Sequence, residues 1–182
     1  MHVEPGHDDE PLPSTPLRLV TLEVESHVAA DGWDQAPRLY ALVPTAELVE
    51  HEPSLAESLS AQLEAQPDGL TSIEQDGLPA DRPLEDVLGE IEWPDAVAGC
   101  AAVVERVMLP QEAERDLPDD PDEMLAFVAE HPDRSEVRLI AAVTRDGERH
   151  SAVRAREPED APLLEGPDLV PGLIDLLTRT LT

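Results

Sequence analysis

The chain has 182 residues, a length typical of one domain, and 41% of them are apolar while only 2% are aromatic, so we expect one mainly aliphatic core. All twelve basic residues are arginines, and 41 acidic residues bring the net charge to −29, which disfavours nucleic acid and membranes as partners. A single cysteine excludes an intrachain disulfide, and neither a signal-peptide pattern nor an apolar run of membrane-spanning length is found, so we expect a cytoplasmic protein.

The acidic charge allows three interpretations. Solubility is the simplest, and halophilic adaptation and mimicry of DNA are the alternatives. The carboxylates are scattered along the chain instead of being spaced like phosphates along one face, which disfavours the DNA mimic. Coding by a GC-rich genome accounts for the use of arginine in place of lysine.

The N-terminal part begins with residues 1–14, which combine prolines, Gly6 and an acidic run. This composition predicts a disordered acidic tail ahead of a single α+β domain over residues 15–182. Thr15 as N-cap and Pro16 at the first helical position predict a helix. Its apolar residues recur at spacings of three and four and should face the core: Leu17, Val20, Val24 and Val28. A turn over 31–37 then leads to a strand over 38–43.

In the middle of the chain, Ser54 and Glu57 have the spacing of a capping box and predict a second helix. Residues 70–75 predict a short strand. The most apolar stretch, 96–109, is ambiguous because it also satisfies a helical period, although Gly99 and the valines favour a strand. A strand that is apolar on both faces must be covered on both sides, so we place it in the middle of a sheet.

Asp120 as N-cap and Pro121 predict a third helix that ends near His131. Its inward-facing residues should be Met124, Phe127 and Val128. A β-hairpin over 136–144 and 149–156 follows, and a three-residue loop over 145–147 best preserves its two faces. That loop sets Leu139 opposite Val153 and Val137 opposite Ala155. A last helix over 168–181 should bury Leu173, Leu176, Leu177 and Leu181.

These elements predict an α+β fold of order α-β-β-β-α-β-β-α, with an antiparallel sheet of about five strands and helices packed mainly on one side. The order resembles that of the type III secretion chaperone-like fold, which implies a homodimer. Four segments, 32–43, 69–76, 91–106 and 168–172, are similar to an uncharacterised family of small acidic proteins from actinobacteria. The resemblance covers the chain after the tail and implies no catalytic residue.

Motifs for catalysis are absent from the sequence, including nucleophile elbows, phosphate-binding loops and zinc-protease patterns. No two of the six histidines have ligand spacing on one element, so we expect neither a metal nor a cofactor. The carboxylates over 116–123 suit helix initiation better than calcium binding. Cys100 lies in the apolar run and should be a buried, unreactive thiol.

Half of the arginines fall within residues 134–157, where six arginines against four acidic residues give a net charge of +2. Arg138, Arg154 and Arg156 share one face of the predicted hairpin. They either pair with carboxylates of the same chain or form a docking face for an acidic partner or a second subunit. Trp33 and Trp93 are expected to be core or rim anchors, with a role in partner binding as the alternative.

The leading hypothesis is therefore a non-enzymatic protein-binding or chaperone-like module, whose partner is an unknown protein or a second copy of the chain. Its predicted partner-binding residues are Arg138, Arg154, Arg156, Trp33 and Trp93. The alternative is a small-molecule-binding enzyme in which Arg38 or Arg106 holds an anion near Glu74 or Asp76.

Overall fold

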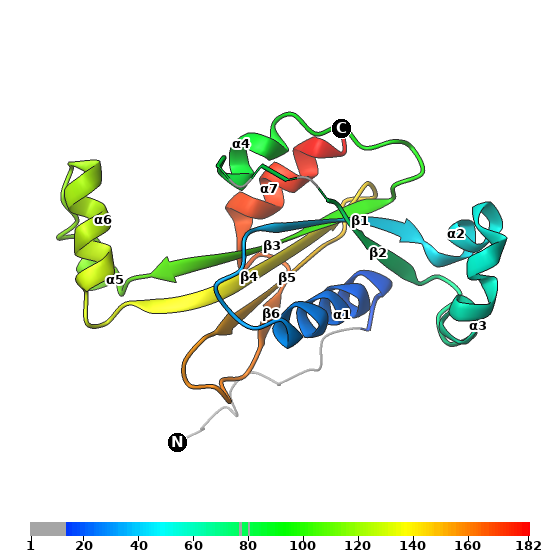
Figure 1. Ribbon diagram of the computed structural model, residues 1–182, viewed down its shortest axis with the longest axis horizontal. Coiled ribbons are helices and arrows are strands. Elements are labelled where there is room, and N and C mark those ends of the chain that lie inside the picture. Colours follow the sequence, from blue (N-terminus) through cyan, green and yellow to red (C-terminus); the bar gives the residue numbers. More distant parts are fainter. Residues whose placement is uncertain (1–13, 77, 80) are drawn as a thin grey trace, which may run out of the picture.

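The computed structural model describes residues 14–76, 78–79 and 81–182, so the predicted tail lies outside the described residues except for Ser14. One antiparallel sheet has the strand order β2-β1-β3-β4-β5-β6 (Figure 1). Its strands are β1 (Arg38–Pro44), β2 (Leu70–Glu74), β3 (Gly99–Met108), β4 (Ser135–Thr144), β5 (Arg149–Ala155) and β6 (Leu164–Gly166). The α+β class and the antiparallel sheet are confirmed, and the short edge strand β6 is an addition.

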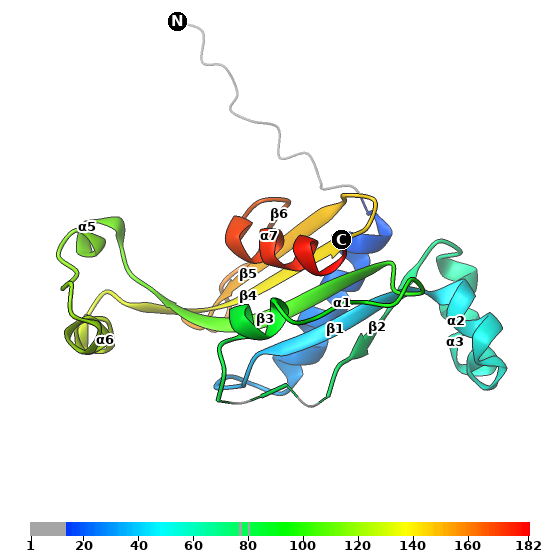
Figure 2. The same ribbon diagram turned by 90° about the horizontal axis from the view of Figure 1, so that it is seen from above.

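The helices lie on both faces of the sheet, which corrects the prediction that they pack mainly on one side. α1 (Pro16–Ala30) covers one face, whereas α4 (Leu84–Leu88) and α7 (Pro171–Thr180) cover the other (Figures 1 and 2). α2 (Thr45–His51), the 3₁₀ turn η1 (Pro53–Leu55) and α3 (Ala56–Ala65) connect β1 to β2, and α5 (Gln111–Glu114) and α6 (Pro121–Glu130) connect β3 to β4. None of the helices in the described part of the chain has the length and apolar character needed to span a bilayer.

Two hydrophobic clusters explain why both faces are covered. Every second residue of the central strands faces α1, and the residues between them face α4 and α7. The cluster on the α1 face includes Val20, Val24, Tyr40, Leu42 and Ile140. The cluster on the other face includes Leu39, Leu84, Cys100, Val143 and Leu177. Since β1, β3 and β4 are apolar on both faces, cover on one side alone would leave a large apolar surface in water.

β3 is a strand in the interior of the sheet, as predicted, and pairs with β1 and β4. Gly99 is its first residue, and a Cβ atom built there would lie 2.3 Å from the carbonyl oxygen of Val143. The hairpin register is also confirmed, because Leu139 lies opposite Val153. Gly147 has φ +87 in the three-residue loop, a conformation that glycine adopts without strain.

Arg145, in the hairpin loop, ties three segments of the α7 face together. Its guanidinium donates hydrogen bonds to four backbone carbonyl groups, those of Val97 (2.8 Å), Leu181 (2.7 Å), Trp93 (3.1 Å) and Pro94 (3.2 Å). The indole Nε1 of Trp93 donates to the hydroxyl of Thr180 on α7 at 2.9 Å. Trp93 is therefore an anchor of the second cluster, in agreement with the first of its two predicted roles.

The helix termini were predicted with mixed success. Thr15 caps α1, and the Asp120 carboxylate accepts hydrogen bonds from the backbone N–H groups of Asp122 and Glu123. The capping box at Ser54 is wrong, because Pro53 begins a 3₁₀ turn and Leu55 precedes α3 without a side-chain cap. Leu177 in α7 and Leu181 at its C-cap are buried as predicted, together with Ile174, while Leu173 and Leu176 pack at the margin of the cluster.

Candidate functional site

Arg138, Arg154 and Arg156, which we call the arginine stripe, lie in the hairpin as predicted, but Arg138 is buried inside the protein. Arg138 and Arg154 are direct neighbours on β4 and β5 and face α1. Arg138 is only 1% exposed, its Cζ lies 4.4 Å from the centroid of the Trp33 ring, and its Nη2 donates to the carbonyl of Gly32. Burial lowers the pKa of this guanidinium. A partner at the surface therefore does not reach Arg138, which instead fastens the 31–37 turn to the sheet.

The other two arginines of the stripe bind carboxylates of the same chain. Arg154 donates through Nε to Glu25 of α1, a buried carboxylate. Arg156 donates to Asp34 at 2.9 and 3.1 Å and to Glu136 at 2.8 Å. These hydrogen bonds raise the pKa of Arg156 and lower that of Asp34. Of the two interpretations offered by the sequence, the contacts within the chain agree with internal pairing.

The remaining predicted site residues come together only in part. Trp93 packs in the cluster on the opposite face from Trp33. Arg38 does meet Glu74, through hydrogen bonds of 2.6 and 3.0 Å, but Arg106 pairs with Glu85 at 2.6 Å on the α4 side of the sheet. Asp76 is exposed beyond the end of β2. Of the two arginines offered for the anion site, Arg38 therefore lies beside Glu74, whereas Arg106 lies on the other face of the sheet.

A projecting arm is the most distinctive feature of the surface, and we define it as residues 105–136. β1 begins at Arg38, opposite Val103 of β3, and β5 pairs with β4 only as far as Val137. Beyond these positions β3 and β4 continue as a two-stranded ribbon to the pair Met108 and Ser135. α5 and α6 lie at its tip, away from the body of the sheet (Figures 1 and 2).

The arm exposes apolar side chains that the protein does not cover. The prediction that α6 faces the core is wrong, because none of its residues is buried. Met124 is 37% and Leu125 is 68% exposed, and on the ribbon Val107 and Met108 are 44% and 50% exposed. Phe127 contacts only the neighbouring ring of His131 among the aromatic pairs of the described residues, at 5.5 Å. The arm thus combines a helix and a ribbon with unpartnered apolar residues.

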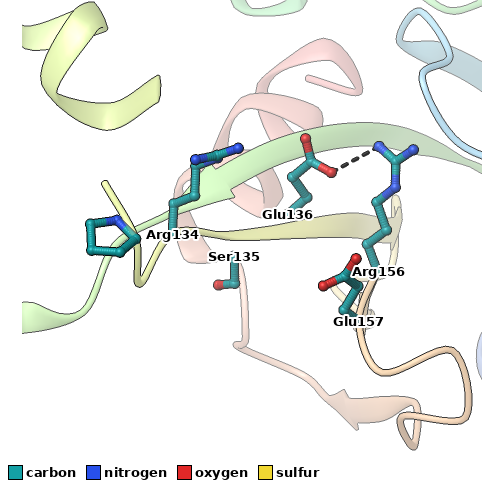
Figure 3. Close-up of a pocket in the computed structure, with 6 residues that line it drawn as sticks. Arg134, Ser135, Glu136, Arg156 and Glu157 are labelled. Carbon is teal, nitrogen blue, oxygen red and sulfur yellow. Dashed lines mark hydrogen bonds and ion pairs between the residues drawn. The ribbon is translucent and has the colours of Figure 1, made fainter. Parts of the chain in front are cut away.

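A groove of about 390 Å³ lies at the base of the arm (Figure 3). It is lined by Pro132, Arg134, Ser135, Glu136, Arg156 and Glu157. Figure 3 shows the Glu136 carboxylate turned toward Arg156, whereas Arg134 and Ser135 point to opposite sides of the backbone at the start of β4. Arg134 makes its hydrogen bond to the carbonyl of His131 at 3.3 Å, and within the described residues it has no carboxylate partner. Its charge is available to a bound molecule.

The groove offers groups for binding and not an activated nucleophile. The Ser135 hydroxyl donates to the backbone carbonyl of Met108 at 3.5 Å and makes no hydrogen bond to a histidine of the described residues. In the part of the chain that the structure describes, no three histidine, cysteine or acidic side chains are arranged to hold a metal ion. The arm was not predicted from the sequence, because the apolar residues of α6 were assigned to the core. The acidic, proline-rich flanks of that helix were the available signal of exposure.

Comparison with known proteins places the chain in a family. A family model described as PPA1309-like protein matches residues 17–182. No curated protein matches the chain, and no solved structure does. The matched region contains the whole sheet, the arm and both hydrophobic clusters. The chain therefore belongs to the PPA1309-like protein family.

Proposed function

We propose that this protein is a non-enzymatic protein-binding module and that the arm, residues 105–136, is the part that contacts the partner. The observation that carries the proposal is the exposure of Val107, Met108, Met124 and Leu125 on a projecting ribbon and helix. Covering apolar surface contributes about 25 cal/mol per Å². A partner that buries these side chains would gain this energy, and such an amphipathic helix is a common recognition element.

Charge favours a basic partner. The arm carries eleven acidic residues and three arginines, a net charge of −8. Of the three arginines, Arg106 pairs with Glu85, and Arg134 has no carboxylate partner among the described residues, so Arg134 is a local exception to the negative charge of the arm. A polypeptide segment with both apolar and basic side chains fits this surface. A second copy of the chain has the same charge and would be repelled, so a homodimer through the arm is the less favoured arrangement.

The test is capture of partners by the tagged full-length protein and by two charge variants. Leu125→Glu places a carboxylate on the arm, and Leu164→Glu places the same group on β6, where the leucine is 59% exposed. We expect a cell lysate of the source organism at moderate salt to yield a polypeptide that the native chain and Leu164→Glu retain and Leu125→Glu loses. Circular dichroism and size-exclusion chromatography establish that all three are folded and whether they are monomeric.

The captured polypeptide then supplies the quantitative test. A synthetic peptide covering its basic, apolar segment should bind the native chain at least tenfold more tightly than Leu125→Glu, as measured by fluorescence anisotropy. A peptide of the same composition in scrambled order controls for attraction to the overall net charge of −29. Equal binding by Leu125→Glu and the native chain would remove the arm from consideration.

Cellular context forms part of the proposal. The single thiol, Cys100, is buried and unpaired, which supports a reducing compartment such as the cytoplasm. The complete replacement of lysine by arginine supports an actinobacterial origin. The likeness to type III secretion chaperones is supported by the antiparallel sheet, while the cover on both of its faces departs from that fold.

A further inference from the structure

We propose a second site, in the pocket between α1 and the edge strand β2, that binds a small organic amine carrying a hydroxyl or carbonyl acceptor. This α1–β2 pocket has a volume of about 380 Å³ and is lined by Glu23, Val24, His27, Tyr40, Ser72 and Glu74. Its size lies within the range that small-molecule sites occupy. It is built from different elements than the arm, so the two proposals succeed or fail independently.

Tyr40 is the first observation that points to a ligand. It is 3% exposed, and its hydroxyl has no hydrogen-bond partner among the described residues. Buried hydroxyl groups nearly always have a partner, because burial without one is costly. Desolvation raises the pKa of Tyr40 to about 12, so that the phenol is a neutral donor at pH 7. An acceptor atom on a molecule bound in the pocket would supply the missing partner.

The charges around the pocket select the second group of the ligand. Tyr40 lies opposite Glu74 in the pairing of β1 with β2, and Glu23 lines the pocket from α1. Arg38 stands beside Tyr40, with Cζ 6.0 Å from the ring centroid. Its guanidinium is already bound to Glu74 and, at 2.9 Å, to Asp31. Three carboxylates against one arginine leave the surroundings negative even when His27 is protonated, so they favour an ammonium group and repel an anion.

The arrangement reverses the charge of the ligand expected from the sequence. Arg38 and Glu74 were predicted to hold an anion, but Arg38 also donates to the Gln35 side chain at 3.0 Å, so its donor groups are engaged by this chain. Glu74 accepts from Arg38 through both of its oxygens, so an ammonium group would pair mainly with Glu23, which lines the pocket from α1, while an acceptor on the ligand meets Tyr40. Ser72 can donate or accept, and Val24 offers an apolar contact to the carbon skeleton.

The experiment is an NMR titration of the uniformly ¹⁵N-labelled full-length chain with four matched four-carbon probes. 4-Aminobutan-1-ol carries both groups, butylamine lacks the acceptor, butane-1,4-diol lacks the charge and 4-hydroxybutyrate reverses it. We expect 4-aminobutan-1-ol to shift the backbone amides of residues 23–27, 40 and 72–74 saturably. Butylamine should bind about tenfold more weakly, which corresponds to the loss of about 1.4 kcal/mol, and the diol and the anion more weakly still. Equal responses to the amine and the anion, or no response to either amine, would overturn the proposal.

Tyr40→Phe separates a binding role from a structural one, because it removes the hydroxyl alone. The variant should bind 4-aminobutan-1-ol about tenfold more weakly while its affinity for butylamine is unchanged. Without ligand its Tm should rise by about 2 to 4 °C, because a buried polar group without a partner is lost. Glu23→Gln should lower the affinity for both 4-aminobutan-1-ol and butylamine. Native affinity for 4-aminobutan-1-ol in Tyr40→Phe would show that the hydroxyl has no ligand-binding role. A fall in the Tm of this variant would show that the hydroxyl already has a partner within the protein, which would also overturn the proposal.

Discussion

Gly99 lies so close to β4 that a side chain does not fit, and we predict that Gly99→Ala is strongly destabilising. The added Cβ would stand 2.3 Å from the Val143 carbonyl oxygen and 3.2 Å from the Cα of Thr144. Ordinary van der Waals contacts begin near 3.4 Å, so the two central strands would have to separate by about 1 Å. Both obstacles are backbone atoms, which cannot rotate away. Forced overpacking of a core commonly costs 1–3 kcal/mol, and we expect a loss of about 3 kcal/mol in the free energy of unfolding.

The assay is urea denaturation followed by far-ultraviolet circular dichroism, with Gly172→Ala as the matched control. Gly172 is the second residue of α7, and a Cβ there meets nothing within 4 Å. That replacement should leave stability unchanged or raise it by about 0.5 kcal/mol, because alanine restricts the unfolded chain. A loss below 1 kcal/mol for Gly99→Ala would refute the close approach of β3 and β4. Failure of this variant to fold, beside a folded Gly172→Ala, would agree with it.

Three further predictions concern hydrogen bonds and charge. Arg145→Ala should lower the free energy of unfolding by about 2 kcal/mol, because it loses the hydrogen bonds to backbone carbonyls. Arg149→Ala is the control and should change this free energy by less than about 0.5 kcal/mol, because the pair of Arg149 with Asp168 is exposed. Urea denaturation measures both. The Arg18 guanidinium holds the pKa of Glu165 below its usual value of 4.5. The native chain should therefore be more stable than Glu165→Gln above pH 4.5, and this difference should vanish as the pH falls through the lowered pKa. Thermal melts of both proteins across pH 3 to 7 measure the difference. Raising sodium chloride from 0.01 to 0.5 M should raise the Tm, because 41 acidic residues exceed twelve arginines even if every arginine is paired; a falling Tm would contradict this.

Local patterns predicted much of the sheet. Side-chain parity gave the register of the hairpin, since a shift of one residue would have exposed one apolar set. Capping residues located α1 and α6, because their hydrogen bonds lie within one turn. β6 was missed because three residues, Leu164–Gly166, are too few to show alternation. Periodicity also identifies the apolar side of a helix without identifying what covers it, and for this reason α6 was misplaced.

The candidate site was harder to predict because its contacts join distant parts of the chain. Parity placed Arg138 and Arg154 on one face, and that was correct. Their partners lie far away in sequence, with Glu25 separated from Arg154 by 129 positions and Asp34 from Arg156 by 122. No local pattern specifies such pairings. The unsatisfied hydroxyl of Tyr40 is likewise a property of the packed structure, since it depends on which groups surround the ring.

The single cysteine provides a native reporter of opening of the sheet. Cys100 is fully buried in β3, its Sγ lies 3.8 Å from the Leu177 carbonyl oxygen, and burial raises its pKa to about 11. Thiolate is the reactive form, so a thiol reagent should label the chain only when β3 separates from α7. When reclosing is faster than labelling, the rate measures the free energy of that opening. Protection of Cys100 from labelling by bound 4-aminobutan-1-ol, and the loss of that protection in a variant that binds the amine weakly, could therefore be followed without introducing a probe into the chain.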